Sequence, residues 1–366
     1  MTKLGVVFGG PSPEHDISIL TGLQAARAMT SAGADVVCLY WTKTGEWLRV
    51  PVESEATTFL SPELKGASPV ELAVPGGFKE RRRLRSSALD VDVILNCCHG
   101  GPGEDGVLTG LLLIAGLRVT GPTPQACALA MDKLATGALA ESVGLETIDT
   151  VLLTLGCEPA DLPSFPWVAK PRFGGSSLGV EADVSDVETV QALATSGVGR
   201  AGMIVQPYLQ GWTDLNVAVR TYPDAQCSAI ERPLREQSVY TYKEKYLTGG
   251  AGMDAAPREL PAQIPSVLAE RVRSNALAIV AQMGIHGAPR VDFLWDGGER
   301  LVLCEVNSIP GAWGNHLWSA TGVSREALYQ GLIDEALARR PGLPQWVGSS
   351  DGSALRASGS ISSKLS

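Results

Sequence analysis

Residues 290–311, RVDFLWDGGERLVLCEVNSIPG, are the stretch of sequence that decides the fold. Two apolar runs flank the turn sequence Asp296-Gly297-Gly298, which predicts a β-hairpin. Because side chains alternate along a strand, Glu305 and Asn307 project from one face, and pairing across the hairpin brings Asp292 toward it, with no His or Cys beside them. Oxygen donors of this kind suit Mg²⁺ that also binds phosphate oxygens and water. The alternative is an exposed polar hairpin face without a metal.

The N-terminal part of the chain has the pattern of a parallel sheet covered by helices. Its mostly apolar runs are bounded by glycines or polar residues, and a segment with apolar residues at helical spacing follows the first of them. The predicted elements are strands at 4–8, 34–41 and 91–97 and a helix at 19–29. Residues 54–87 carry Pro, Gly and a charge run without a clear period, and we predict a surface excursion there.

The pattern of the sequence changes after Gly121-Pro122, where an Ala- and Leu-rich stretch begins. The elements predicted beyond this point are helices at 125–143 and 265–283 and strands at 147–155, 167–170, 215–220 and 228–232. We therefore expect an α/β and α+β fold with three domains, followed by a tail too polar to offset its ordering entropy. The predicted boundaries are 1–121 for the N-terminal α/β domain, 122–209 for a central lobe, 210–342 for a C-terminal lobe and 347–366 for a disordered tail.

Composition and charge limit the kinds of molecule that we expect the protein to bind. The 366 residues carry 30 basic and 39 acidic side chains, a net charge of −9, and no long basic tract, which argues against nucleic-acid binding. No apolar run is long enough for a membrane helix and the N-terminus lacks the pattern of a secretion signal, so we expect a cytoplasmic protein without a membrane partner. Seven cysteines without a Cys-x-x-Cys pair indicate reduced thiols in the core.

Three glycine-rich loops are candidates for ligand contacts. The loop KPRFGGSSLG (170–179) follows an apolar strand and could close over phosphates, although it is not a Walker A loop and a flexible turn is the alternative. The loop GGPSPEH (9–15) lacks dinucleotide-binding spacing; its Glu14 could hold an ammonium group, or the loop could simply cap a helix. The loop HGGPGEDG (99–106) follows the C-terminal end of a strand, where open α/β sheets place ligands.

Taken in order, these segments resemble the D-alanine–D-alanine ligases of the ATP-grasp superfamily, from Gly5 to about Leu337. The matching motifs are FGGPSPEHDIS, HGGPGEDGVLTGLL, GPTPQACALAMDK, VAKPRFGGSSLGV, YKEKYL, PRVDFL and EVNSIPG. The resemblance implies an open parallel pre-ATP-grasp domain followed by a two-lobed ATP-grasp fold. It also implies ATP-dependent ligation of two D-alanines through an acyl phosphate for peptidoglycan synthesis, with two Mg²⁺ or Mn²⁺ ions, and a homodimer.

The resemblance implies roles in binding the nucleotide and its metal ions. Residues implied to contact ATP are Lys133 and Lys170 at the phosphates, Gln206 and Leu209 at adenine, Asp214 at the ribose, and Lys245 on a closing loop. The implied metal ligands are the hairpin residues Asp292, Glu305 and Asn307.

The resemblance also implies roles at the two amino-acid substrates. The implied residues are Glu14 and His99 around the first substrate, Ser176 and Tyr246 as a hydrogen-bonded pair at the junction, Arg290 and the Gly311 N–H at the oxyanion, and His316 and Leu317 at the second substrate. One such oxyanion donor is typically worth about 3–4 kcal/mol.

Two positions depart from the family pattern. The usual Glu-Lys near adenine is Gln206-Pro207, which removes one side-chain donor and one N–H. His316 stands where a serine usually holds the second substrate's carboxylate, so a D-Ala–D-X ligase or another specialised amino-acid ligase is the nearest alternative. A non-catalytic nucleotide-binding protein and a nucleotide-dependent oxidoreductase are remote ones.

Overall fold

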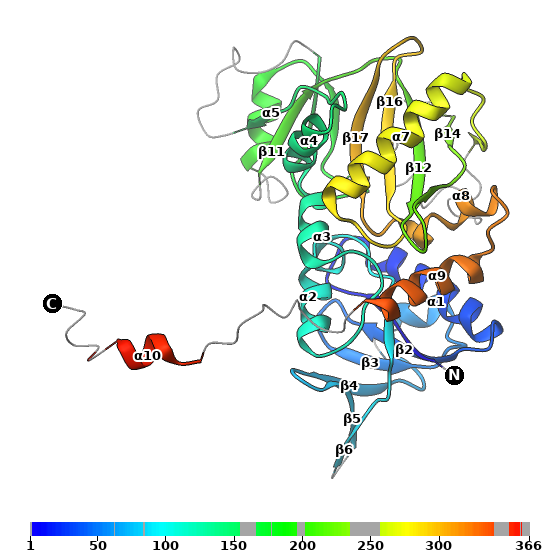
Figure 1. Ribbon diagram of the computed structural model, residues 1–366, viewed down its shortest axis with the longest axis vertical. Helices are drawn as coiled ribbons and strands as arrows, with labels where there is room; N and C mark the ends of the chain where they lie inside the picture. Colours follow the sequence, from blue (N-terminus) through cyan, green and yellow to red (C-terminus); the bar gives the residue numbers. More distant parts are fainter. Residues whose placement is uncertain are drawn as a thin grey trace.

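The computed structural model describes residues 2–61, 63–82, 85–153, 166–176, 178–195, 202–234, 257–339, 351–358 and 360. Figure 1 shows an N-terminal domain below and two lobes above it, with helix α9 (Arg325–Ala338) returning to the lower domain. Among the described residues, no helix combines the length and the apolar character that a membrane span requires.

The N-terminal domain is built on a seven-stranded sheet in the order β6-β5-β4-β3-β2-β1-β7. Its parallel part consists of β1 (Lys3–Gly9), β2 (Asp35–Trp41) and β7 (Val93–Asn96), as predicted. The antiparallel part consists of β3 (Trp47–Val50), β4 (Ser68–Ala73), β5 (Gly77–Arg82) and β6 (Arg85–Ala88).

The antiparallel strands show that the prediction of a surface excursion over 54–87 is wrong for much of that segment. Only the 3₁₀ helix η1 (Ala56–Leu60) and the turns around it fit the prediction. Val70 and Phe78 bury their side chains against Trp47 in the same hydrophobic cluster, so the short strands extend the core of the sheet. These strands are short, and charged residues stand between their apolar ones. The alternation could therefore not be recognised from the sequence alone.

Helices cover the two faces of this sheet. Helix α1 (His15–Ser31) buries Ile19, Leu23 and Met29 in one hydrophobic cluster with β1 and β7. On the other face, α2 (Val107–Ile114) follows the 3₁₀ helix η2 (Gly101–Gly103) and packs in a second cluster.

The central lobe begins with two helices where one was predicted over 125–143. Helix α3 (Pro124–Met131) starts at Thr123, whose hydroxyl accepts from the Ala126 N–H at 3.3 Å. The chain then leaves helical geometry at Asp132 (φ −86°, ψ 101°), and α4 (Lys133–Ser142) begins. Because Asp132 accepts N–H groups of the next helix, it starts a new helix rather than continuing the first.

A four-stranded antiparallel sheet completes this lobe, in the order β10-β9-β11-β8, with α5 (Val187–Thr195) beside it. Its strands are β8 (Val151–Leu153), β9 (Trp167–Pro171), β10 (Glu181–Val184) and β11 (Met203–Pro207). The predicted strand over 167–170 is confirmed. The one predicted over 147–155 is shorter among the described residues, with an isolated bridge from Thr147 to Leu303.

The C-terminal lobe contains the predicted hairpin. Its sheet has the order β13-β12-β16-β17 and packs against α7 (Ser266–Met283), which Figure 1 shows crossing the sheet in yellow. Its strands are β12 (Thr213–Arg220), β13 (Gln226–Cys227), β16 (Arg290–Trp295) and β17 (Leu301–Asn307), and a separate pair is formed by β14 (Arg232–Pro233) and β15 (Arg258–Glu259). Gly284 ends α7 in left-handed geometry.

The hairpin register contains one irregularity. Asp292 pairs with Glu305, but Phe293 pairs with Leu303, so Cys304 is an extra residue in β17. A bulge of this kind interrupts the strict alternation of side chains, so a side chain can point to the face opposite to the one that alternation predicts.

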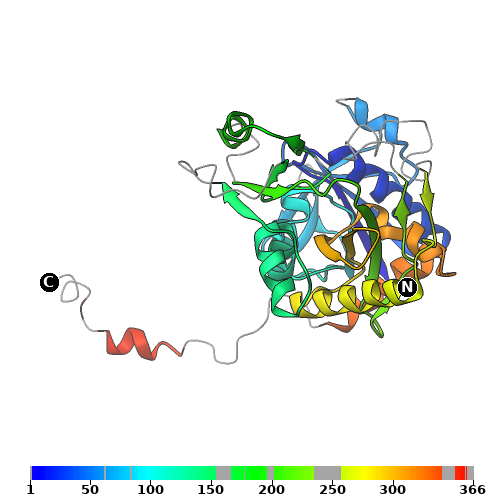
Figure 2. The same ribbon diagram turned by 90° about the horizontal axis from the view of Figure 1, so that it is seen from above.

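The last segments pack on the N-terminal domain although they follow the C-terminal lobe. They are η6 (Gly311–Gly314), α8 (Asn315–Ser319) and α9 (Arg325–Ala338). Trp313, Leu317 and Leu332 share one hydrophobic cluster with α1 and β7. The segment predicted to be a disordered tail contains a short exposed helix, α10 (Ser353–Ala357), which stands apart from the rest in Figures 1 and 2.

Candidate functional site

A cavity of about 290 Å³ lies where the N-terminal domain meets the two lobes. Most of the side chains selected from the sequence line it. Those that do are Glu14, His99, Lys133, Lys170, Ser176, Gln206, Leu209, Asp214, Arg290, Asp292, Glu305, Asn307, Gly311 and His316.

One selected residue lies elsewhere, and two others are not among the described residues. Leu317 is fully buried in the core that α8 and α9 form with α1, so its side chain is core packing rather than a substrate contact. Lys245 and Tyr246 lie outside the described residues.

The hairpin supplies the acidic wall of the cavity. Asp292 and Glu305 are paired across the strands, and Asn307 Nδ2 donates to Asp292 Oδ2 at 2.9 Å. Arg290 donates from Nε and Nη2 to the two oxygens of Asp292, both at 2.7 Å, and fixes the orientation of that carboxylate. The predicted convergence of two carboxylates and an amide is therefore present, and this donor set fits Mg²⁺.

The bulge adds a residue that strict alternation did not predict. Cys304 lines the cavity beside Glu305, contrary to the expectation that no Cys shares this face. Burial raises the pKa of the Cys304 thiol to about 11, so the sulfur stays protonated and is a poor metal ligand at neutral pH. Among the described residues, no three Asp, Glu, His or Cys side chains gather as a metal cluster, so an ion there would need the Asn307 amide or further oxygens from a ligand.

Two lysines form the basic wall. Lys170 is the second-last residue of β9 and is buried, while Lys133 starts α4 and donates from Nζ to the Gly174 carbonyl at 2.6 Å. Burial lowers the pKa of Lys133, and the charge of Lys170 lowers it further, against the opposing effect of Glu305. Two ammonium groups brought together in this way favour an anionic ligand.

Asp132 holds the lysine wall in place. Its Oδ1 accepts from the N–H groups of Leu134 and Ala135 at 3.1 and 3.2 Å. The same carboxylate accepts from Arg172 Nε and Nη2 at 2.8 and 2.5 Å. One side chain thus joins the start of α4 to the glycine-rich loop that follows β9.

Part of the cavity lining is apolar. Ile148, Val168 and Leu294 line the cavity, as does Gln206, which is buried. Gln206 Nε2 donates to Thr150 Oγ1 at 2.7 Å, so its side-chain carbonyl is the group available to accept from an amine. A flat apolar ring with an exocyclic amine would match this wall.

The N-terminal domain closes the cavity with Glu14. Its side chain is buried, and Ser176 Oγ donates to Glu14 Oε2 at 2.6 Å. His99 lies beside it, with Nδ1 contacting the Ile309 carbonyl and Nε2 contacting Thr21. Burial lowers the pKa of His99 to about 4, so it is neutral and positions neighbouring groups.

Glu104 is a cavity residue that the sequence analysis did not single out. Its carboxylate accepts from the N–H groups of Gly100 at 3.0 Å and Ile309 at 3.3 Å. Burial and the nearby charge of Glu14 raise the pKa of Glu104 to about 7. The signal was its place in the loop HGGPGEDG, but nothing in the sequence distinguished this acid from the adjacent Asp105.

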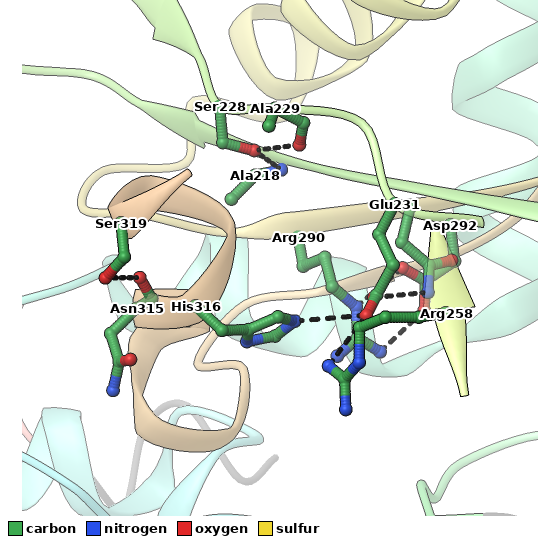
Figure 3. Close-up of polar contacts among 11 residues, drawn as sticks. Ala218, Ser228, Ala229, Glu231, Arg258, Arg290, Asp292, Asn315, His316 and Ser319 are labelled. Atoms are coloured by element: carbon green, nitrogen blue, oxygen red, sulfur yellow. Dashed lines mark hydrogen bonds and ion pairs between the residues drawn. The ribbon is translucent and has the colours of Figure 1, made fainter. Parts of the chain in front are cut away.

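A second group that the sequence analysis missed surrounds Glu231. Figure 3 shows His316 and Arg258 directed at its carboxylate, with Arg290 beside them. Arg258 Nη1 lies 2.8 Å from Glu231 Oε1, and His316 Nε2 lies 3.4 Å from the same oxygen. Burial alone would raise the pKa of Glu231, but His316 and the two guanidinium groups outweigh it and lower the pKa to about 2. Glu231 and Arg258 are far apart in sequence and belong to no motif, so only the fold reveals this cluster.

Comparison with known proteins agrees with this architecture. The family model described as D-ala D-ala ligase N-terminus matches residues 3–122, and the model described as D-ala D-ala ligase C-terminus matches residues 157–334. The D-alanine–D-alanine ligase of Mycobacterium bovis (strain BCG) is 32% identical, over 93% of this chain and 97% of its own. That of Mycolicibacterium smegmatis is 31% identical with the same coverage.

Solved structures share the fold. The VanG D-Ala:D-Ser ligase from Enterococcus faecalis superposes with a TM-score of 0.74 at 24% identity, over 92% of this chain and 99% of its own. The D-alanine-D-alanine ligase from Coxiella burnetii gives a TM-score of 0.74 at 21% identity, over 92% of this chain and 94% of its own. The predicted N-terminal α/β domain and two-lobed ATP-grasp fold are thus confirmed. With two family models in order and relatives matched along almost their whole length, the chain belongs to the D-alanine–D-alanine ligase family.

Proposed function

We propose that the protein joins two D-alanines, using ATP, to give D-alanyl-D-alanine for peptidoglycan synthesis. The observation that carries the proposal is one cavity in which a basic wall, an acidic hairpin and a buried carboxylate converge. A carboxylate is a poor electrophile, so ATP must first phosphorylate it to an acyl phosphate. These three groups match the phosphates, the divalent cations and the substrate ammonium of such a reaction. The curated relatives from two mycobacterial genera carry the same activity in their names.

In the first step, Glu14 would hold the ammonium of the first D-alanine by charge, with Ser176 fixing the carboxylate's orientation. Lys133 and Lys170 would bind the ATP phosphates and offset the charge of the phosphoryl group as it moves. Asp292, Glu305 and Asn307 would hold Mg²⁺ or Mn²⁺, as two ions, and bound ions would further neutralise the phosphate charge. At the other end, Gln206 and Leu209 would contact adenine and Asp214 the ribose.

In the second step, the neutral amine of the second D-alanine attacks the carbonyl carbon of the acyl phosphate; a C–N bond forms, the C–O bond to the phosphate breaks, inorganic phosphate leaves and the amine loses a proton. The developing oxyanion would be stabilised by Arg290 and the Gly311 N–H, and one such donor is typically worth about 3–4 kcal/mol. The roles proposed for Lys245 and Tyr246, which are to close over the site and exclude water, concern residues outside the described ones and stay predictions.

The test is D-alanine-dependent ADP release. The wild-type protein should release ADP only with D-alanine and a divalent cation, and Glu305→Gln should lower the rate by at least about 100-fold because it removes a metal-binding charge. Glu188→Gln, at an exposed acid on α5, is the matched control and should leave the rate unchanged. Unchanged ADP release in Glu305→Gln would overturn the enzyme assignment.

A D-Ala–D-X ligase is the second candidate, and His316 in the cavity is the observation that favours it. A panel of second amino acids, assayed by coupled ADP release, separates the two. Faster turnover with another acceptor than with D-alanine would replace the first candidate.

Three further expectations concern the molecule as a whole. A place in the cytoplasm and a homodimer remain predictions, which cell fractionation and sedimentation would test. The number of bound ions is testable by titration with Mn²⁺ in the presence of ATP, where two ions per chain are expected.

A further inference from the structure

A strained turn contains Gly311, which lines the cavity. The turn is the 3₁₀ helix η6, in which Ala312 (φ 46°, ψ 30°) and Trp313 (φ 55°, ψ 26°) have left-handed backbone geometry. This geometry costs free energy for any residue with a Cβ atom, and here two such residues follow one another. The surrounding structure must therefore hold the turn, because relaxation of Ala312 would move the Gly311 N–H beside it.

The N-terminal domain supplies the contacts that hold this turn. The Ala312 N–H donates to Thr21 Oγ1 of helix α1 at 3.2 Å, across 291 positions of the sequence. The Trp313 indole Nε1 donates at 3.1 Å to the carbonyl of Asn96 at the end of β7, and its ring is fully buried. Trp313 is thus anchored by its side chain, and Ala312 by its N–H. Because Thr21 is 3% exposed, solvent does not readily replace its hydroxyl as a partner.

His99 fixes the direction of the Thr21 hydroxyl. Its Nδ1 lies 2.9 Å from the Ile309 carbonyl, which can only accept, so Nδ1 carries the proton. Because burial lowers the pKa of His99, the ring is neutral, and Nε2 accepts the Thr21 O–H at 2.8 Å. With its proton directed at His99, the Thr21 oxygen is an acceptor for the Ala312 N–H. His99 and Thr21 thus hold the segment 309–312 at both ends.

We propose that Thr21 and His99 are positioning residues for the second step, because they hold the strained turn in the geometry that presents the Gly311 N–H to the oxyanion. The proposal rests on the proposed ligase function and adds that the N-terminal domain sets the direction of this donor. A donor stabilises an oxyanion only when it is already in place, so a small shift of the turn slows the attack. The first step forms no tetrahedral oxyanion and does not make this demand.

The experiment separates the two steps in the full-length protein. ADP release with D-alanine measures the complete reaction. Exchange of oxygen-18 between the β,γ-bridge and the β-phosphate of ATP measures the first step, because it requires only that the acyl phosphate forms and reverts. Thr21→Val keeps the shape of the side chain without its hydroxyl, and it should lower kcat for ADP release at least about tenfold. Oxygen exchange should not fall, because an acyl phosphate that waits for attack reverts more often.

Three further variants distinguish positioning from general damage. Thr21→Ser keeps the hydroxyl and should recover at least about a third of the wild-type kcat. Thr109→Val is the matched control and should behave as wild type, because Thr21 and Thr109 are both 3% exposed, neither is among the described residues that line the cavity, and Thr109 lies on α2. Adding Ala312→Gly to Thr21→Val should raise kcat at least about threefold, since glycine adopts left-handed geometry without a Cβ penalty.

Ala312→Val tests the turn from its other side, also in the event that Thr21→Val does not fold. A β-branched side chain resists left-handed geometry, so kcat should fall at least about tenfold while oxygen exchange persists. Wild-type activity of Ala312→Val, equal losses of ADP release and oxygen exchange in Thr21→Val, or no rescue by Ala312→Gly would each overturn the proposal. If the wild type catalyses neither reaction with D-alanine, the ligase function itself fails; if it catalyses both and Thr21→Val slows neither, only this inference fails.

Discussion

Glu14 and Glu104 line the same cavity, and burial together with the charge of Glu14 raises the pKa of Glu104. Glu14 accepts from the Ser176 hydroxyl, whereas among the described residues Glu104 accepts from the backbone N–H groups of Gly100 and Ile309. Because their environments differ, Glu14 is suited to hold a cation, whereas Glu104 is readily neutral near pH 7.

Glu14→Gln should impair use of the first D-alanine more than binding of ATP. The carboxylate's charge pairs with ammonium, and losing one charged hydrogen bond of this kind costs about 1.5–3 kcal/mol, or roughly 10- to 100-fold in kcat/KM. Steady-state kinetics with each substrate varied separately would measure it. Ser176→Ala, which keeps the charge, should have a smaller effect, and equal losses for D-alanine and ATP would contradict the role.

Glu104 should make the free protein's stability depend on pH. Its folded pKa, about 7, lies above its ordinary value of 4.5, so the folded state binds more protons between these values and stability falls as pH rises through this window. Relative to wild type, Glu104→Gln should gain roughly 2 kcal/mol of unfolding free energy between pH 5 and pH 8. Urea unfolding at both pH values checks this, and a difference that does not vary with pH would show that Glu104 titrates normally.

The sequence could predict most cavity residues because each lies in a compact motif at the end of an element. It could not predict Glu231, Arg258 or the cavity-facing position of Cys304. Glu231 and Arg258 come together only through tertiary packing. The position of Cys304 depends on a β-bulge, which changes the alternation of side chains along β17, and no Gly or Pro in the strand marks that bulge.

Among the elements, the junction of α3 and α4 determines where Lys133 lies. The expected single helix over 125–143 had strong Ala and Leu propensity, but Asp132 competes for N–H groups and divides it. The antiparallel strands β4 to β6 were missed for the opposite reason: their stability comes from pairing and packing, which short charged segments do not reveal.

Asp132→Ala should lower stability and weaken ATP binding together. It removes a helix cap worth about 1 kcal/mol and a half-buried contact with Arg172, so we expect a loss of about 1–3 kcal/mol. Asp132→Asn retains the cap acceptor and should lose less. Thermal unfolding measures the loss of stability, and calorimetry measures ATP binding. A destabilised variant with unchanged ATP affinity would show that Asp132 does not position Lys133 for ATP binding.

At the scale of the whole molecule, the N-terminal domain depends on the chain's distant end. Helix α9 packs against β7 and α1, and its Arg339 donates to the carbonyls of Val119 and Gly121 at 2.8 and 3.0 Å. Glu335, on the same helix, accepts from Thr221, the residue that follows β12, at 2.7 Å. Helix α9 and the residue after it thereby join the N-terminal domain, the linker that leaves it and the C-terminal lobe.

Removing α9 should unfold the N-terminal domain, whereas removing the tail should not. A chain ending at Ser324 loses four fully buried apolar side chains, each worth about 1.5–3 kcal/mol, namely Leu328, Tyr329, Leu332 and Ile333. A chain ending at residue 350 loses only exposed α10 among the described residues and should keep its melting temperature and ADP release. Circular dichroism and the activity assay would compare them, and a stable, active chain ending at Ser324 would contradict the expectation.

The return of α9 also bears on how the chain matures as it leaves the ribosome. Residues 3–122 are translated before both lobes, but α9, which covers one face of their sheet, is translated only after both lobes. Until then, apolar side chains of α1 and β7 stay uncovered, so the nascent N-terminal domain cannot complete its core before α9 has been made.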